Sequence, residues 1–223
     1  MSKSKNNSNV FLSNQLLKQY TEDDSQLQNV PGSILLDFKE DLHNLGFSFQ
    51  VLNQAEALMP KHKDTILPIV IKYYKAATIP SEKQYLLKWF HHRGLDEVIP
   101  MLIEDYYSPC SDTARWAIGD RLYEIRSKHY VKEYIKMITN PKFGIARQMV
   151  VLLLGKLKEE SAIPTLIDLL KDEEVRLHVI SALSEYKREE FRQYFEKFQD
   201  STHPGWRKSA RAALRRLGDK RRE

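Results

Sequence analysis

Residues 144–172 read GIARQMVVLLLGKLKEESAIPTLIDLLKD. The stretch holds two short helical patterns: an arginine before an apolar run that ends in Leu-Gly, and, after a polar break, Ile-Pro before a second apolar run. One such pair of helices cannot bury both of its apolar faces by itself, so it requires copies on either side. The stretch therefore predicts a repeat architecture.

The first helix of this pair recurs along the chain at intervals of 29–32 residues, counted from the basic residue at its start. Positions three and seven residues after the basic one are apolar or small, and both offsets lie on one helical face. The basic positions are Lys83, Arg115, Arg147, Arg176 and Arg207. The column seven residues later reads Phe90, Leu122, Leu154, Leu183 and Leu214, and Leu58 occupies the same column one register earlier, where the basic residue is absent.

The second helix also recurs, with proline at or near its start in several copies. Proline is tolerated in the first turn because its missing N–H would have no partner within the helix. The aligned starts are Leu67-Pro68, Ile99-Pro100, Val131-Lys132, Ile163-Pro164 and Phe191-Arg192. Residues three, four and seven positions later are apolar and are predicted to form the core faces. A period near 31 residues with two helices per unit predicts an all-α solenoid.

The stretch 144–172, and the following residues up to Leu183, resemble short bacterial HEAT-like repeats of the phycobilin-lyase type. This resemblance implies a right-handed superhelix of about five to six helical hairpins. It also implies a buried arginine that bonds an acidic residue of the neighbouring repeat. That structural role maps onto Arg115, Arg147, Arg176 and Arg207, with Asp112, Asp172 and Asp200 as candidate partners.

Three segments are predicted from the composition along the chain. Residues 1–32 form a flexible polar leader, residues 33–218 the solenoid, and residues 219–223 a basic C-terminal tail. Ser33 is the expected N-cap of the first helix, and Gly46 is expected to end it.

The composition favours a monomeric cytoplasmic protein without membrane insertion. The single Cys110 excludes an intramolecular disulfide and suits a reducing compartment. No apolar run approaches the roughly 18–20 residues that a membrane helix requires. The formal net charge is +5, and the excess of Lys and Arg is concentrated after Trp206.

No pattern in the sequence predicts catalysis, a metal or a cofactor. The neighbours His91 and His92 point about 100° apart on a helix, so they cannot chelate one ion as an i, i+4 pair could. No glycine-rich phosphate loop and no Gly-x-Ser-x-Gly elbow occurs. The chain is therefore expected not to be an enzyme.

In HEAT-type solenoids the second helices line the concave face, which the resemblance makes the expected binding surface. The positions of the second helices that are not predicted to be buried carry charges of both signs. Such a mixture suits a protein or peptide partner better than nucleic acid. In each of the pairs Tyr73-Tyr74 and Tyr106-Tyr107, one ring belongs to the core column and the other is expected to point elsewhere. The candidate partner-binding residues are Lys72, Tyr73, Lys75, Glu104, Tyr107, Lys136, Asp168 and Lys171.

The basic C-terminal helix offers an alternative surface. Lys208, Arg211, Arg215 and Arg216 could contact phosphates, an acidic protein or a membrane surface, or could simply be the polar cap that a terminal repeat needs. The leading hypothesis is a non-catalytic scaffold or adaptor for a protein partner. The alternative is a nucleic-acid-binding or DNA-repair protein, because some DNA glycosylases use HEAT-like solenoids, and a bilin-lyase-like role rests on repeat type alone.

Overall fold

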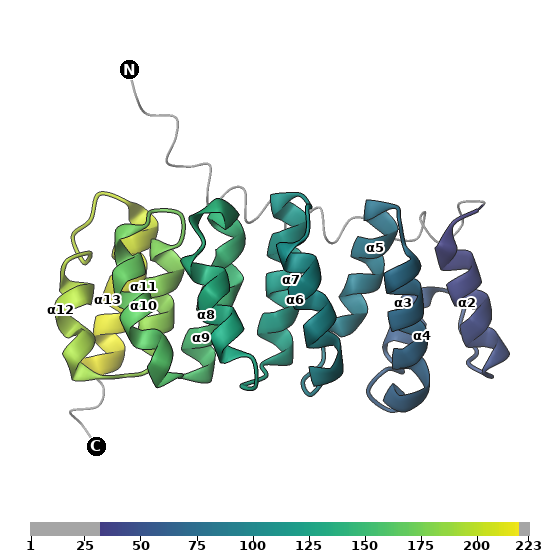
Figure 1. Cartoon of the computed structure of the whole chain (residues 1–223). Helices are drawn as coiled ribbons and strands as arrows, with labels where there is room; N and C mark the ends of the chain where they lie inside the picture. The colour runs from purple at the N-terminus through teal and green to yellow at the C-terminus, as the bar shows by residue number, and fades with distance from the viewer. Residues whose placement is uncertain (1–31, 219–223) are drawn as a thin grey trace. The chain divides into compact units, whose positions relative to one another are not determined.

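A computed structural model describes residues 32–218, which fold into helices without any strand (Figure 1). The chain divides into two compact units, Met1–His92 and Arg93–Glu223. Consecutive helices pack on one another within each unit, which confirms the all-α solenoid class. The predicted tail and, except for Gly32, the predicted leader lie outside the described residues.

Unit 1 begins at the predicted N-cap. The Ser33 hydroxyl accepts a hydrogen bond from the backbone N–H of Leu35 (3.2 Å) and donates one to the buried carboxylate of Glu82 (2.7 Å). The N-terminus of a helix carries positive partial charge, so it stabilises a carboxylate placed there. The described elements are α2 (Ile34–Asn44), α3 (Leu52–Glu56), α4 (Lys63–Ala76), α5 (Pro80–Leu87) and the 3-10 turn η2 (Lys88–Phe90).

The helix α4 begins earlier than the sequence predicts. It starts at Lys63, so Pro68 lies inside the helix rather than in its first turn, and the expected start at Leu67 is wrong. The additional turn includes Ile66 and Leu67, which are both buried. Burial of these side chains offsets the backbone hydrogen bond that the proline cannot donate.

Unit 2 consists of two layers of helices. The first helices α7, α9, α11 and α13 pack on one another in succession, and each second helix packs on the first helix that follows it (Figure 1). The first helices are α7 (Asp112–Ile125), α9 (Gln148–Leu157), α11 (Arg176–Glu185) and α13 (Pro204–Gly218). The second helices are α6 (Ile99–Tyr107), α8 (Val131–Thr139), α10 (Ile163–Asp168) and α12 (Arg192–Glu196). Five 3-10 segments accompany them: η3 (Asp96–Val98), η4 (Pro141–Arg147), η5 (Glu160–Ala162), η6 (Leu169–Lys171) and η7 (Glu189–Phe191).

The recurring arginines of unit 2 bond carbonyl groups at or beyond the ends of the second helices. These carbonyls have no partner within their helix, and an arginine side chain can satisfy them. The guanidinium groups also lie against aromatic rings, Arg115 over Phe143 (4.9 Å) and Arg176 over Trp206 (4.1 Å). The carbonyl contacts are Arg115 with Tyr106 (2.8 Å) and Ser108 (3.1 Å), Arg147 with Ile138 (3.4 Å), Arg176 with Leu170 (2.7 Å) and Lys171 (2.8 Å), and Arg207 with Ser201 (2.6 Å).

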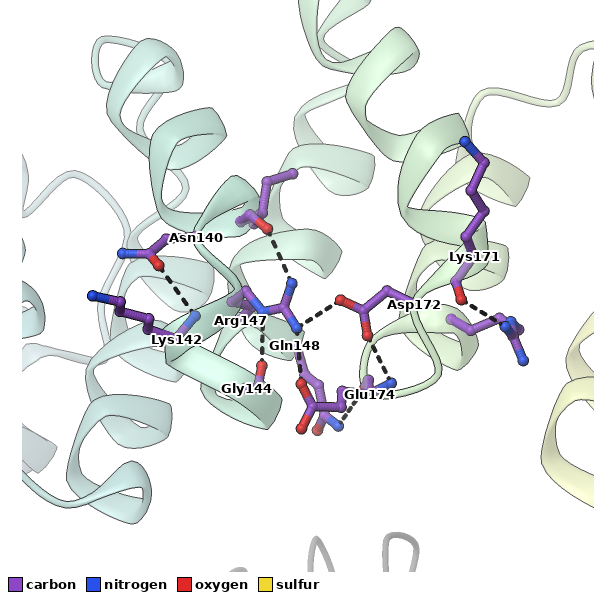
Figure 2. A network of polar contacts seen from close by, with 10 residues as sticks. Asn140, Lys142, Gly144, Arg147, Gln148, Lys171, Asp172 and Glu174 are labelled. Carbon is purple, nitrogen blue, oxygen red and sulfur yellow. Dashed lines mark hydrogen bonds and ion pairs between the residues drawn. The ribbon is translucent and has the colours of Figure 1, made fainter.

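Arg147 also connects two successive repeats (Figure 2). Its side chain is 1% exposed, and Nη2 lies 2.8 Å from Asp172 and 3.1 Å from Glu174, both beyond α10. Its Nε donates to the carbonyl of Gly144 (2.8 Å), which has a positive φ of 47° that glycine adopts without strain. The arginine therefore holds the end of one repeat, its own turn and the start of the next repeat together.

Gly155 allows α9 and α11 to approach closely. A Cβ atom at this position would lie 2.4 Å from the Cα of Ala182 and 2.8 Å from its carbonyl oxygen. These are backbone atoms, so neither contact can be relieved by a side-chain rotation. The Leu-Gly of the repeat pattern is therefore a packing requirement.

We predict that Gly155→Ala destabilises unit 2. Overpacking typically costs about 1–3 kcal/mol, which exceeds the roughly 1 kcal/mol that alanine gains over glycine in a helix. Gly218→Ala is the matched control, because nothing lies within 4 Å of its added Cβ. Urea unfolding followed by far-UV circular dichroism compares the two variants. Equal stabilities would show that the close approach is absent.

We predict that Arg147→Met lowers the free energy of unfolding by about 3 kcal/mol, since breaking a buried ion pair costs roughly 3–5 kcal/mol and the acidic partners here remain partly exposed. Arg211→Met is the control, because its 52% exposed side chain pairs with the 80% exposed Asp200. An exposed pair of this kind contributes about 0–1 kcal/mol. Urea unfolding of both variants measures the difference, and similar losses would contradict the structural role of Arg147.

We predict that His178 makes unit 2 sensitive to acid. Its Nδ1 is enclosed without a hydrogen-bond partner among residues 32–218, and burial lowers its pKa to about 4. The unfolded chain binds the proton near pH 6.5 and the folded chain does not. The free energy of unfolding is therefore unaffected by His178 above pH 6.5. It decreases as the pH falls from 6.5 to about 4, on the order of 3 kcal/mol in total.

The variant His178→Leu tests this prediction, because leucine keeps an apolar side chain there without titrating. Unfolding free energies measured between pH 7 and 4 should fall more steeply for the wild type than for the variant. His129→Leu is the control, since the His129 side chain is 80% exposed. A wild-type slope that persists in His178→Leu would assign the acid sensitivity to other groups.

Candidate functional site

The positions predicted for partner binding lie on α4 in unit 1 and on α6, α8, α10 and η6 in unit 2. Seven of the eight side chains are exposed. They are Lys72 and Lys75 in unit 1, and Glu104, Tyr107, Lys136, Asp168 and Lys171 in unit 2. The positions of the second helices that the core pattern does not use are therefore exposed to solvent, apart from Tyr73.

Tyr73 is the exception, and the expectation that its ring is exposed is wrong. The residue is 6% exposed, and its ring packs against Phe38 of α2 at a centroid distance of 5.4 Å. Its hydroxyl donates to Asp41 (2.8 Å). Tyr74 is buried as well, against Phe90, so both rings of this pair belong to the core of unit 1. The reason is that α2 covers the side of α4 that carries Tyr73.

Lys72 is exposed but already has a partner in unit 1. Its ammonium group lies 2.8 Å from the same Asp41 oxygen that Tyr73 bonds. These hydrogen bonds, from Lys72 first, lower the pKa of Asp41. The α4 residues Lys72 and Tyr73 thus hold α2 in place.

In the other tyrosine pair, the predicted division of roles is observed. Tyr106 is fully buried, whereas Tyr107 is 43% exposed. The Tyr107 ring contacts Phe143 edge-on at a centroid distance of 5.5 Å. Partial burial and the charge of Glu133 raise the pKa of the Tyr107 hydroxyl. Tyr107 is therefore a neutral ring held in one orientation at the surface of α6.

The lysines of the unit 2 positions are paired with carboxylates one turn away on the same helical segment. Lys136 lies 2.8 Å from Glu133, and Lys171 lies 2.5 Å from Asp168. The hydrogen bond that Lys136 donates to Glu133 raises the pKa of Lys136. Both pairs are of the i, i+3 type, whereas α6 carries the exposed Glu104 and no basic residue.

A row of isoleucines between these charges was not identified from the sequence as surface. The residues four positions after the start of each second helix were predicted to lie in the core. The structure leaves Ile103, Ile135 and Ile167 half-buried, whereas the residues before them are buried. The recurrence of isoleucine at intervals of 32 residues was the available signal. We call the exposed side of α6, α8, α10 and η6 that carries this row the second-helix face.

The basic residues of α13 are largely bonded to acceptors of unit 2 itself. Ala210, Ala213 and Leu217 bury one side of the helix, and the exposed cations Lys208 and Arg215 lie elsewhere on it. Asp200, a candidate partner of the recurring arginines, pairs with Arg211, which is not one of them. The contacts are Arg207 with the carbonyl of Ser201 (2.6 Å), Arg211 with the carbonyl of Gln199 (2.8 Å) and Asp200 (3.0 Å), and Arg216 with Ser184 Oγ (2.8 Å) and Glu185 (3.6 Å).

Two further properties concern the part of the chain that the structure describes. Within residues 32–218, no group of three or more His, Cys, Asp or Glu side chains is arranged to hold a metal ion. None of the helices in this range combines the length and apolar character that crossing a membrane requires.

A comparison with known families matches residues 131–215 to the model of HEAT repeats. No curated protein and no solved structure matches the chain. The matched region begins at α8 and ends within α13, so it contains three of the four arginines described above and most of the second-helix face. The chain therefore carries HEAT-like repeats over this region.

Proposed function

We propose that the protein is a non-catalytic scaffold that holds a protein or peptide partner on the second-helix face of unit 2. The observation that carries this proposal is the surface of α6, α8 and α10. Each helix repeats a half-buried isoleucine next to exposed polar side chains, and Tyr107 adds an exposed aromatic ring. Aromatic residues of this kind are enriched at the centres of protein interfaces.

The repeat type supports the same proposal. Helical repeats stack into extended surfaces that are used for binding, and their chemistry is set by the residues that stacking leaves exposed. A role as an adaptor in the reducing cytoplasm agrees with the single Cys110. The finer likeness to repeats of the phycobilin-lyase type concerns the repeat pattern alone and suggests no lyase activity.

A nucleic-acid-binding role is less well supported. Affinity for nucleic acid comes mainly from cations that neutralise phosphates. On the second-helix face the lysines Lys136 and Lys171 already have carboxylate partners, and on α13 Arg207, Arg211 and Arg216 are bonded within unit 2. These bonds occupy part of the donor capacity of the cations.

We predict that Tyr107→Ala weakens capture of the partner by about 30-fold or more, because an aromatic residue at the centre of an interface contributes about 2 kcal/mol or more. The measurement is affinity capture from an extract of the source cells, with and without nuclease, followed by titration of the captured protein. The matched control is Arg215→Glu, which reverses an exposed charge on α13.

Wild type and Arg215→Glu should retain the same protein partner after nuclease treatment, and Tyr107→Ala should lose it. If capture depends on Arg215 and on intact nucleic acid but is unaffected by Tyr107→Ala, the binding surface is the basic helix and the proposal is wrong.

A further inference from the structure

We propose that copies of this chain associate through the first and last described helices, with α13 of one copy packed along α2 of another. Each of these helices leaves one side exposed, and the charges on the two exposed sides have opposite signs. The contact lies outside the second-helix face, so it goes beyond the proposed function. It also departs from the monomer that the composition favours.

Both helices bury one side and expose the opposite one. α2 packs on α4, and α13 packs on α11 and α12. The buried residues recur at intervals of three and four, which places them on one face of each helix. They are Leu35, Phe38 and Leu42 in α2, and Ala210, Ala213 and Leu217 in α13. In a stack of helical repeats, the remaining side of such a helix is the one that a further helix would cover.

The exposed side of α2 is acidic. Asp37 and Glu40 are exposed, and their carboxylates have no hydrogen-bond or ion-pair partner among residues 32–218. The other charged or titratable side chains of α2 are bonded within unit 1. They are Lys39, bonded to the carbonyl of Gln50 (2.7 Å), Asp41, paired with Lys72 (2.8 Å), and His43, whose Nδ1 lies 2.9 Å from the carbonyl of Phe47.

The exposed side of α13 is basic. Lys208, Arg211 and Arg215 are exposed and follow one another at intervals of about one helical turn. Arg211 is paired with the exposed Asp200 (3.0 Å), whereas the side chains of Lys208 and Arg215 have no such partner in the described part of the chain. The helix itself contains no acidic residue. Its other two cations are bonded within unit 2, Arg207 to Ser201, and Arg216 to Ser184 and Glu185.

The two charged rows fit each other when the helices lie side by side. Asp37 and Glu40 are about 4.5 Å apart along the axis of α2, and Lys208 and Arg211 are equally far apart along α13, because an α-helix rises 1.5 Å per residue. Two carboxylates can therefore face two cations at once. Two copies of α2, or two copies of α13, would instead bring like charges together, which restricts the contact to the unlike pair.

Apolar surface lies beside both rows. Leu36 is half-buried and lies one turn before Glu40, and Ala212 is half-buried and lies one turn after Lys208. Contact between the two helices covers these side chains, and removal of apolar surface from water favours association.

A second copy of the chain satisfies both rows, and nucleic acid satisfies one. The phosphates of a nucleic acid would complement α13 alone and would leave the carboxylates of Asp37 and Glu40 without a cation. In a second copy, each row meets its complement, and the two rows are present in equal numbers. The charge pattern of the chain therefore favours self-association.

The test uses the full chain and sedimentation velocity at protein concentrations up to about 1 mM, because a few exposed ion pairs give only weak association. The average mass of the wild type should rise with concentration. The dissociation constant should increase at least about tenfold between about 0.1 M and about 1 M salt, because the Debye length falls from about 10 Å to about 3 Å.

Charge reversal identifies the two helices. The acidic-side variant carries Asp37→Lys and Glu40→Lys, and the basic-side variant carries Lys208→Glu and Arg215→Glu. Each variant alone presents like charges on both helices, so its dissociation constant should increase at least about tenfold. An equimolar mixture of the two variants should associate again, because each helix then meets the opposite charge on the other variant.

The control variant reverses two exposed lysines elsewhere, Lys75→Glu on α4 and Lys132→Glu on α8. It changes the net charge by the same amount as the basic-side variant and should change the dissociation constant by less than about twofold, because neither lysine lies on α2 or α13. Circular dichroism verifies that all variants remain folded.

A wild type that stays monomeric over the whole concentration range would overturn the inference, and so would association that survives both reversals or a mixture that stays monomeric. If the wild type stays monomeric but binds a single-stranded oligonucleotide that the basic-side variant does not bind, α13 is a nucleic-acid surface instead. None of these measurements involves Tyr107, so failure here leaves the test of the proposed function intact.

Discussion

The carbonyl groups at the C-terminal end of a helix have no partner within that helix, and a stack of short helices contains many such ends. Unit 2 satisfies them with the arginine that begins the next first helix. The planar guanidinium offers five N–H donors in a fixed arrangement, so one side chain can bond the preceding helix and the following turn at once. Arg147 does this most completely, because it reaches Ile138, Gly144, Asp172 and Glu174 from a buried position. The spacing between successive repeats depends on this interaction together with the close contact between Gly155 of α9 and Ala182 of α11.

The surface that remains is a consequence of this stacking. The first helices α9 and α11 each lie between two other first helices of unit 2, and the second helices keep one side exposed. On that side, the acidic and basic residues are three positions apart and pair along the helix, as Lys136 does with Glu133.

Several cations of α13 are bonded to acceptors of unit 2. Arg207 and Arg211 bond carbonyls that precede α13, and Arg216 bonds Ser184 of α11. In unit 1, Lys72 is likewise bonded to Asp41 and helps to hold α2 against α4. These cations therefore also close helix ends and join elements.

The sequence by itself determined the helical class, the period of the repeat, most of the core columns of the first helices and the N-cap at Ser33, since apolar periodicity and capping are local properties. Leu58 and Leu214, which were predicted to lie in the core, are only half-buried, and Leu58 lies in a turn after α3. It also located the exposed columns of the second helices. The burial of Tyr73, the half-exposed position of the isoleucines and the pairing of Asp200 with Arg211 were decided by the tertiary structure. The physical reason is that one turn of a helix can face core or solvent depending on which neighbour covers it, and that neighbour, such as α2 over α4, lies about 30 residues away in the chain.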